Sequence, residues 1–193
     1  IKVDEKPLFY VFDPDSCPDM KEFIQLWQHL AEKNGIPGIH FVARADSIGK
    51  ADEIYKKNFM NEVKARYDRY IDMGFDAVSS MNFRRAEILA TGFFKKIIRN
   101  IRRKIFGYAL TEHYYTDEDK LDYVYPQITP RKDKTPRAGK NALVYTGSTP
   151  EKFRIAIKMA LEKIKDKDDE HKILFLNSWN EWGEGSYMEP DIV

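Results

Sequence analysis

Residues 173–185 have the sequence Ile-Leu-Phe-Leu-Asn-Ser-Trp-Asn-Glu-Trp-Gly-Glu-Gly, and this stretch decides how the fold is interpreted. The apolar run Ile173–Leu176 changes abruptly into tryptophans, an amide and carboxylates. Continuous apolar runs of this length are typical of strands that are buried in parallel sheets. The stretch therefore predicts a late buried strand whose far end is polar and aromatic.

Further strands and helices alternate upstream of this segment. Predicted strands cover Leu8–Phe12, Ile39–Ala43, Phe75–Met81 and Tyr123–Ile128. Predicted helices run from Asp19 until Gly35, over 53–73, over 93–106, and from Pro150 through Ile164. In the first helix, Phe23, Leu26, Trp27 and Leu30 form the apolar stripe that is expected to face the core. Pro126 is expected to confine its strand to a sheet edge or a strand end.

This alternation predicts a parallel α/β fold of the (β/α)8 TIM-barrel type. A closed barrel typically needs about 250 residues. The 193 residues contain about five predicted strands, so we expect one α/β domain over residues 1–193 that forms the C-terminal part of a barrel. Both ends look cut from a longer protein, because the chain starts without Met and stops just after the motif.

Composition excludes several classes of function. The formal net charge is +1, which argues against a nucleic-acid partner. Cys17 is the single cysteine, so an internal disulfide framework is excluded and a reducing, cytoplasmic compartment is slightly favoured. No stretch has the roughly 20 apolar residues of a membrane span, and no signal peptide is visible.

The candidate chemistry is a pair of glutamates just beyond the last predicted strand. In parallel α/β folds, functional residues lie at the carboxyl ends of the strands, where Glu181 and Glu184 fall. The flanking glycines permit a tight turn, and the neighbouring tryptophans are expected to desolvate a carboxyl group and raise its pKa. Such a pair suits glycoside hydrolysis, which needs one acid and one carboxylate. The alternative is two surface glutamates in a loop.

The segment Trp179–Gly185, followed by Met188–Asp191, closely resembles the signature of the WbsX family, a glycosyltransferase-named branch related to glycoside hydrolase family 99, the endo-α-mannosidases. A second resembling block is Tyr125–Pro130, followed by Asp133, Thr135-Pro136 and Arg137. This chain has Arg131-Lys132 where the family pattern has glycine and an aromatic residue.

The resemblance implies roles for individual residues. Glu184 would be the general acid/base, and Glu181 would assist attack by the sugar's own 2-hydroxyl, a substrate-assisted route. The residues implied to bind or orient the sugar are Trp179, Asn180, Trp182, Glu189, Tyr125, Asp133 and Arg137. The implied substrate is an oligosaccharide or polysaccharide with mannose-type or related linkages, and neither a metal nor a cofactor is expected.

Two other features suggest different partners. Asp13-Pro14-Asp15 follows a predicted strand and mimics the Asp-x-Asp sequence that binds a metal and a nucleotide-sugar in many transferases, but an ordinary turn is the preferred interpretation. The basic helix over residues 95–104 suits either an anionic membrane surface or a simple solvated face, and we favour the solvated face.

These features leave three functional hypotheses. The first is a glycoside hydrolase-like enzyme that uses Glu181 and Glu184. The second is a glycosyltransferase in lipopolysaccharide, O-antigen or capsule biosynthesis. The third is a non-catalytic sugar-binding remnant.

Overall fold

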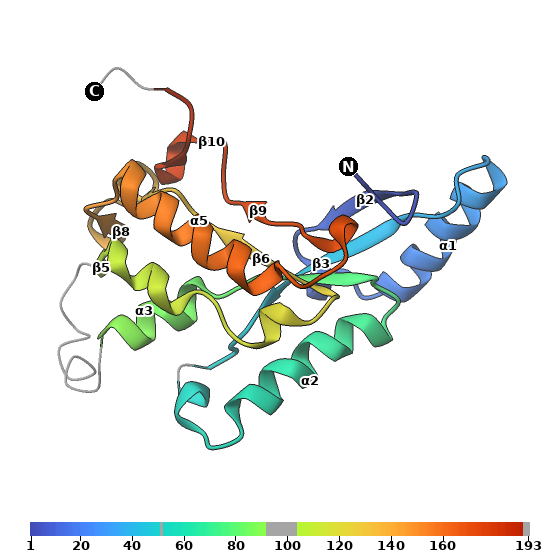
Figure 1. The fold of residues 1–193 in the computed structure, drawn as a ribbon, viewed down its shortest axis with the longest axis horizontal. Coiled ribbons are helices and arrows are strands. Elements are labelled where there is room, and N and C mark those ends of the chain that lie inside the picture. Colours follow the sequence, from blue (N-terminus) through green and yellow to red (C-terminus); the bar gives the residue numbers. More distant parts are fainter. Residues whose placement is uncertain (51, 92–103, 191–193) are drawn as a thin grey trace.

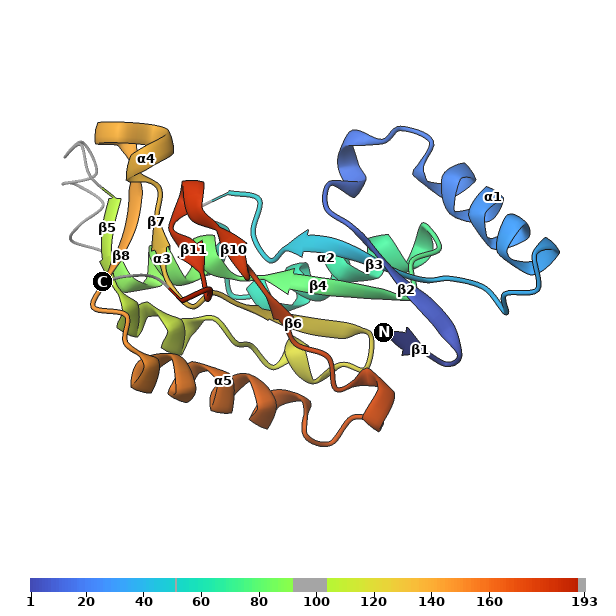
Figure 2. The same cartoon turned by 90° about the horizontal axis from the view of Figure 1, so that it is seen from above.

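The structure is a computed structural model that describes residues 1–50, 52–91 and 104–190. Its main sheet has six strands, of which the first two are antiparallel and the rest are parallel (Figure 1). In spatial order the strands are β1 (Lys2–Val3), β2 (Lys6–Val11), β3 (His40–Asp46), β4 (Ala77–Met81), β6 (Val124–Ile128) and β9 (Phe175–Leu176). The five strands expected from the sequence are thus confirmed as neighbours in one parallel array, which curls as a half-barrel (Figure 2).

The outer face of the sheet packs against helices. Helices α1 (Met20–Lys33) and α2 (Phe59–Asp72) cover β3 and β4 through a core of aromatic and aliphatic side chains. A second core joins α3 (Phe83–Thr91) and α5 (Pro150–Ile164). The Thr149 side chain caps α5 by accepting a hydrogen bond from the Lys152 N–H, as the sequence pattern predicts. Short 3-10 turns cover Pro14–Ser16, Glu53–Tyr55, Tyr108–His113, Glu118–Lys120, Gly139–Asn141 and Asp169–His171.

Most of the predicted apolar stripe of α1 does not face the core. Of its four residues, Phe23 packs against the core, but Leu26, Trp27 and Leu30 are 55%, 41% and 39% exposed. Trp27 stacks on the half-exposed ring of Phe9 in β2, with ring centroids 6.2 Å apart. The helix is turned so that Met20, Ile24 and Ala31 are buried against the sheet.

A second sheet, of three strands, was not predicted from the sequence. Part of the reason is that the apolar residues before its first strand recur at helical spacing. Strand β5 (Lys104–Gly107) pairs in parallel with β8 (Leu143–Thr146), which pairs antiparallel with β7 (Lys132–Asp133). The predicted helix over 93–106 is therefore wrong at its end, where backbone pairing with β8 overrides the period. Residues 95–103 of the expected basic helix lie outside the described residues.

Two further predictions need comment. Pro126 lies within β6, between β4 and β9, so the strand is central rather than at an edge. The sequence over 108–122 predicts an acidic, aromatic loop, and the structure has 3-10 turns there whose Tyr108, Tyr114 and Asp119 side chains are buried. The Asp119 carboxylate accepts hydrogen bonds from the Ser80 hydroxyl at 2.5 Å and from the Thr116 N–H at 2.6 Å, which satisfies its buried oxygens.

The concave face of the sheet contains a buried polar chain. The Tyr125 hydroxyl lies 3.1 Å from His40 Nε2 and 2.8 Å from His171 Nδ1. Burial lowers the pKa of His40, against the opposing effect of Asp76. His40 is therefore less protonated in the folded protein than an exposed histidine is at the same pH.

We expect this arrangement to make the protein sensitive to acid. Because the folded-state pKa of His40 is lowered, the unfolded chain takes up protons first, and stability falls as pH drops below about 6.5. His40→Gln should flatten that pH dependence. In thermal unfolding measured between pH 7.5 and 5, the fall in Tm across this range should be at least about 2 °C smaller for the variant than for the native protein. His29→Gln on the exposed face of α1 is the control. An unaltered profile for His40→Gln would contradict the explanation.

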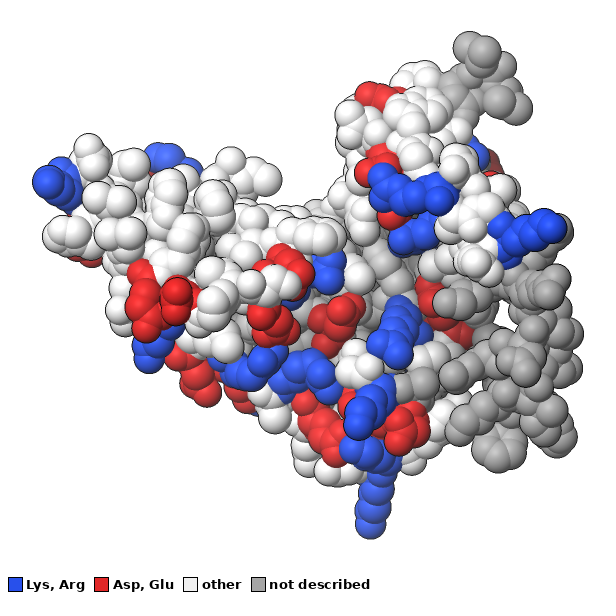
Figure 3. All heavy atoms as spheres, turned by 180° about the vertical axis from the view of Figure 1, so that it is seen from behind, with Lys and Arg blue, Asp and Glu red and all other residues white. Residues whose placement is uncertain are grey.

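Figure 3 shows the molecule from the opposite side, with a hollow between the end that bears α1 and the end that bears β10. Acidic and basic side chains are intermixed on this face. In the described part of the chain, no helix is both long and apolar enough to cross a bilayer.

Candidate functional site

The candidate glutamates lie on a small hairpin that follows β9. Strand β10 (Asn180–Glu181) pairs with β11 (Ser186–Tyr187), and the 3-10 turn η8 (Trp182–Glu184) connects them. The Ser178 hydroxyl ties the base of the hairpin together: it donates to the Ser186 carbonyl at 2.6 Å and accepts from the Glu181 N–H at 3.0 Å. These bonds fix the backbone from which both carboxylates project.

Gly185 closes this hairpin against β7. Its φ of +57° is in the left-handed region that favours glycine. A Cβ atom at Gly185 would lie 2.8 Å from the Asp133 nitrogen and 2.9 Å from the Asp133 carbonyl oxygen. The two segments can therefore approach this closely only because residue 185 has no side chain.

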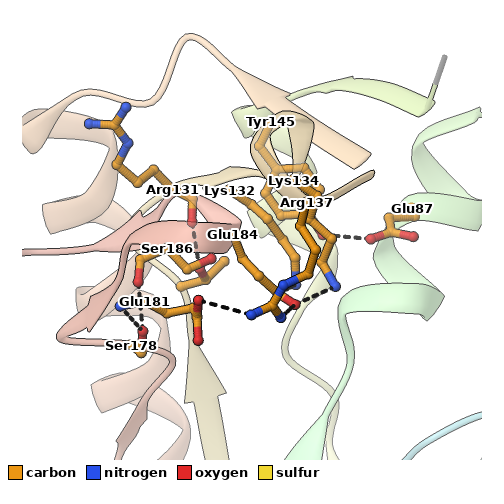
Figure 4. Close-up of polar contacts among 11 residues, drawn as sticks. Glu87, Arg131, Lys132, Lys134, Arg137, Tyr145, Ser178, Glu181, Glu184 and Ser186 are labelled. Carbon is orange, nitrogen blue, oxygen red and sulfur yellow. Dashed lines mark hydrogen bonds and ion pairs between the residues drawn. The ribbon is translucent and has the colours of Figure 1, made fainter. Parts of the chain in front are cut away.

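Both carboxylates point toward one guanidinium from the opposite segment (Figure 4). Arg137, in α4 (Thr135–Ala138), donates from Nη1 to Glu184 Oε1 at 2.9 Å, and its Nη2 lies 3.5 Å from Glu181 Oε1. The Lys134 ammonium lies 3.0 Å from the same Glu184 oxygen, and Lys132 Nζ lies 3.8 Å from the other one. Glu184 is thus surrounded by three cations, whereas Glu181 contacts one.

These cations shift the pKa of Glu184 in the direction opposite to the expected one. Partial burial acts to raise its pKa, but Lys134, Lys132 and Arg137 together lower it below the ordinary value. The prediction of a raised pKa is therefore wrong for Glu184, because it considered the neighbouring tryptophans and left out the cations across the hairpin. Glu184 is ionised at neutral pH and can accept a proton.

Aromatic rings lie beside the carboxylates. Trp182 stacks on Tyr187 with ring centroids 3.7 Å apart, and its Nε1 donates to Glu189 Oε2 at 2.6 Å. Trp182 and Trp179 remain 46% and 59% exposed. Asn180 is also exposed. The hairpin therefore presents flat apolar surface and hydrogen-bonding groups to solvent together.

Two other predicted residues are engaged differently. Asp133 is brought to the site through its close backbone contact with Gly185, but its Oδ1 accepts from the Thr135 N–H at 2.8 Å and so binds the start of α4. Tyr125 is fully buried in β6, and its hydroxyl contacts the two histidines described above. The expectation that Tyr125 binds substrate is therefore not supported by its position, since the fold of β6 encloses the side chain.

Lys132 and Lys134 are the site residues that sequence reasoning missed. Both lie in the basic stretch 131–140, which was interpreted as a loop. Lys132 is buried beside the Phe83 ring, and burial lowers its pKa. Their alternation about Asp133 was the available signal, because alternate residues of a strand lie on one face.

The described residues contain no group of three or more metal-binding side chains. In Asp13-Pro14-Asp15, the Asp15 carboxylate accepts from Arg69 Nη2 at 2.8 Å and from the Tyr70 hydroxyl at 2.8 Å. Asp13 accepts from the Ser16 hydroxyl at 2.7 Å. This pattern supports the turn interpretation of the Asp-x-Asp sequence.

The geometry can now be set beside known proteins. A model of the family described as "Glycosyltransferase WbsX" matches residues 1–193. The chain belongs to the WbsX glycosyltransferase family. Uncharacterized protein WxcX from Xanthomonas campestris pv. campestris strain B100 is 23% identical over 194 residues, and the same protein from a second strain is equally similar. The match covers 99% of this chain and 25% of that relative, so the chain spans about a quarter of its length.

A solved structure with a similar fold is titled "Glycoside hydrolase-like protein". Its TM-score is 0.56 at 16% sequence identity, over 98% of this chain and 48% of that one. The WbsX chain therefore shares its α/β half-barrel arrangement with part of that structure.

Proposed function

We propose that this WbsX protein is a carbohydrate-active enzyme of glycoside hydrolase type, and that Glu181 and Glu184 act on a glycosidic bond. The observation that supports this best is the convergence of both carboxylates on Arg137 beside two exposed tryptophans. Surface glutamates without function would not require three cations from a separate segment. Exposed tryptophans suit sugar rings, whose apolar faces stack on aromatic ones.

The two glutamates have different environments, which favours different roles. Cleavage uses Glu184 in two states: protonated, it gives its proton to the leaving oxygen, and ionised, as in the free protein, it takes a proton from the attacking water. Arg137 binds both carboxylates and is positioned to release one when a substrate hydroxyl replaces it. Glu181, with a side chain 42% exposed against 20% for Glu184, is the carboxylate that a sugar 2-hydroxyl reaches first.

Glycosyl transfer is the second candidate. A transferase also needs a base for its acceptor hydroxyl, which an ionised Glu184 supplies, and the family description favours it. The biological setting would then be the assembly of a surface polysaccharide such as lipopolysaccharide, O-antigen or capsule. The two candidates share the same carboxylates and differ in whether water or a sugar accepts the glycosyl group.

We further propose that the half-barrel is the C-terminal part of a (β/α)8 barrel. Support comes from the parallel order of β2, β3, β4, β6 and β9, and from the 48% of the glycoside hydrolase-like chain that the match covers. In such a barrel, the hairpin that bears Glu181 and Glu184 lies at the catalytic end of the strands.

A product analysis tests the proposed function. The protein is incubated with fluorescently labelled α-mannose oligosaccharides, the class that the family resemblance implies, with and without added unlabelled sugar acceptors. We expect shorter labelled products, which Glu181→Gln should reduce by about 10²-fold or more. Products that appear only with an acceptor or an activated donor would favour transfer over hydrolysis. Sugar binding without any turnover, unchanged by Glu181→Gln, would reject the catalytic proposal.

A further inference from the structure

A second polar cleft lies at the carboxyl ends of β2 and β3. Its volume is about 300 Å³, within the range of about 300–1,000 Å³ that is typical of small-molecule sites. The turn after β2, the end of β3, one side of α2 and the start of α3 form its walls. Four of its lining residues are Arg44, Arg66, Arg69 and Arg84.

One of these arginines, Arg69, already binds another residue of the cleft wall. Arg69 Nη2 donates to both oxygens of Asp15, at 2.8 and 3.1 Å, and Tyr70 donates to the same carboxylate. Asp13, another lining residue, accepts from Ser16. These pairs close the turn after β2 against α2 and leave three arginines and Asp46 to face the cleft.

The three remaining guanidinium groups have unused hydrogen-bond donors. Each guanidinium has five N–H groups. Arg84 donates from Nη1 to the Gly49 carbonyl at 2.9 Å. Arg66 donates from Nη2 to Glu53 at 3.0 Å. Among the described residues, these contacts leave further N–H groups of both arginines for a ligand in the cleft.

Arg44 is the best placed of the three. It lies on the concave face near the end of β3, and its guanidinium stacks on the Phe12 ring at 4.1 Å from the ring centroid. Within the described part of the chain, its closest carboxylate is that of Asp46, at 3.9 Å, which is too long for a hydrogen bond. Stacking orients the planar fork without using its N–H groups, and that fork matches carboxylate and phosphate oxygens.

Asp46 makes the cleft differ from a site for a simple anion, because it places a carboxylate among the arginine donors. Its carboxylate can accept a hydrogen bond from a ligand and lies 3.9 Å from Arg44 Nη2. A small inorganic anion would use the donors but would be repelled by Asp46. A sugar that has both an anionic group and free hydroxyls would satisfy the arginines and the aspartate together.

We propose that this cleft binds a sugar that bears an anionic oxygen group, with the anion on Arg44, Arg84 and Arg66 and a hydroxyl on Asp46. The ligand class rests on the proposed carbohydrate function and makes it more specific: the substrate or donor is acidic. The shared chemistry is a carboxylate or phosphate on a sugar, from either a uronic acid residue or a sugar phosphate. Both the cleft and the Glu181–Glu184 hairpin follow the carboxyl ends of strands of the main sheet.

The test is a titration of the protein, followed by NMR, with D-glucuronate, glucose 1-phosphate, neutral glucose and inorganic phosphate. We expect at least one of the two anionic sugars to bind at least tenfold more tightly than glucose. Glucuronate alone would identify an acidic polymer residue as the ligand, and glucose 1-phosphate alone would identify a phosphorylated donor. Arg44→Gln should weaken that binding at least tenfold, and Arg154→Gln on the exposed face of α5 should not.

Arg84→Gln provides a second variant, because its exposed side chain can change without disturbing the fold. It should weaken binding of the anionic sugar severalfold. Equal binding of glucose and both anionic sugars, binding of inorganic phosphate only, or full affinity in both arginine variants would overturn the proposal. Binding is measured in Glu184→Gln as well, since retained affinity there separates this cleft from the catalytic proposal.

Discussion

Glu184→Gln is expected to lower turnover of a glycosidic substrate by about 10³-fold or more while the protein stays folded. The variant keeps the shape and hydrogen-bonding capacity of the side chain but removes its negative charge and its ability to accept a proton. In the native protein, Lys134 and Arg137 lower the pKa of Glu184, so the ionised form is present at neutral pH. Initial rates and a thermal unfolding curve, measured on the same preparations, check both parts of the expectation.

Glu162→Gln is the matched control for this experiment. Glu162 is also an ion-paired glutamate, with Lys165 Nζ at 2.5 Å, but it lies on the solvent side of α5 with a side chain 68% exposed. Its replacement removes the same charge away from the hairpin and should leave turnover unchanged. Turnover of Glu184→Gln at the native rate would exclude this carboxylate as the catalytic base.

Gly185→Ala is expected to destabilise the protein by about 2–5 kcal/mol and to abolish most activity. Part of this energy is the cost of a left-handed conformation for an L-residue, about 1–2 kcal/mol. The rest arises because the new methyl group would lie 2.8–2.9 Å from three atoms of Asp133, two of which are backbone atoms that cannot rotate away. Relief of this contact must move the hairpin from β7 and so separate Glu184 from Lys134 and Arg137.

The glycine at position 35 offers a comparison that isolates the steric part. It follows α1 with a φ of +77°, in the left-handed region like Gly185, but an added Cβ would meet nothing within 4 Å. Gly35→Ala should therefore show only the conformational cost, about 1–2 kcal/mol. Denaturant unfolding of both variants measures the difference. Equal destabilisation by the two substitutions would show that the contact with Asp133 has no energetic effect.

Local sequence signals located the five parallel strands, because short apolar runs between helices have few alternatives in an α/β fold. The same signals failed where a partner distant in sequence decides the outcome. Strand β5 exists through its pairing with β8, although the residues before it have a helical period. Pro126 lies inside a central strand, and Leu26, Trp27 and Leu30 of α1 lie outside the core.

By itself, the sequence determined that Glu181 and Glu184 follow an apolar strand and share a tight turn with Gly183 and Gly185, since chain order and residue type are local properties. Only the tertiary structure decided which cations surround Glu184 and lower its pKa. Arg137 is 47 positions from Glu184 along the chain, and it reaches Glu184 because Gly185 lets the hairpin lie directly on Asp133. A carboxylate's pKa depends on charges within a few ångströms, whatever their distance in sequence. The cations that hold Glu184 in its ionised form therefore come from the fold and not from the local sequence.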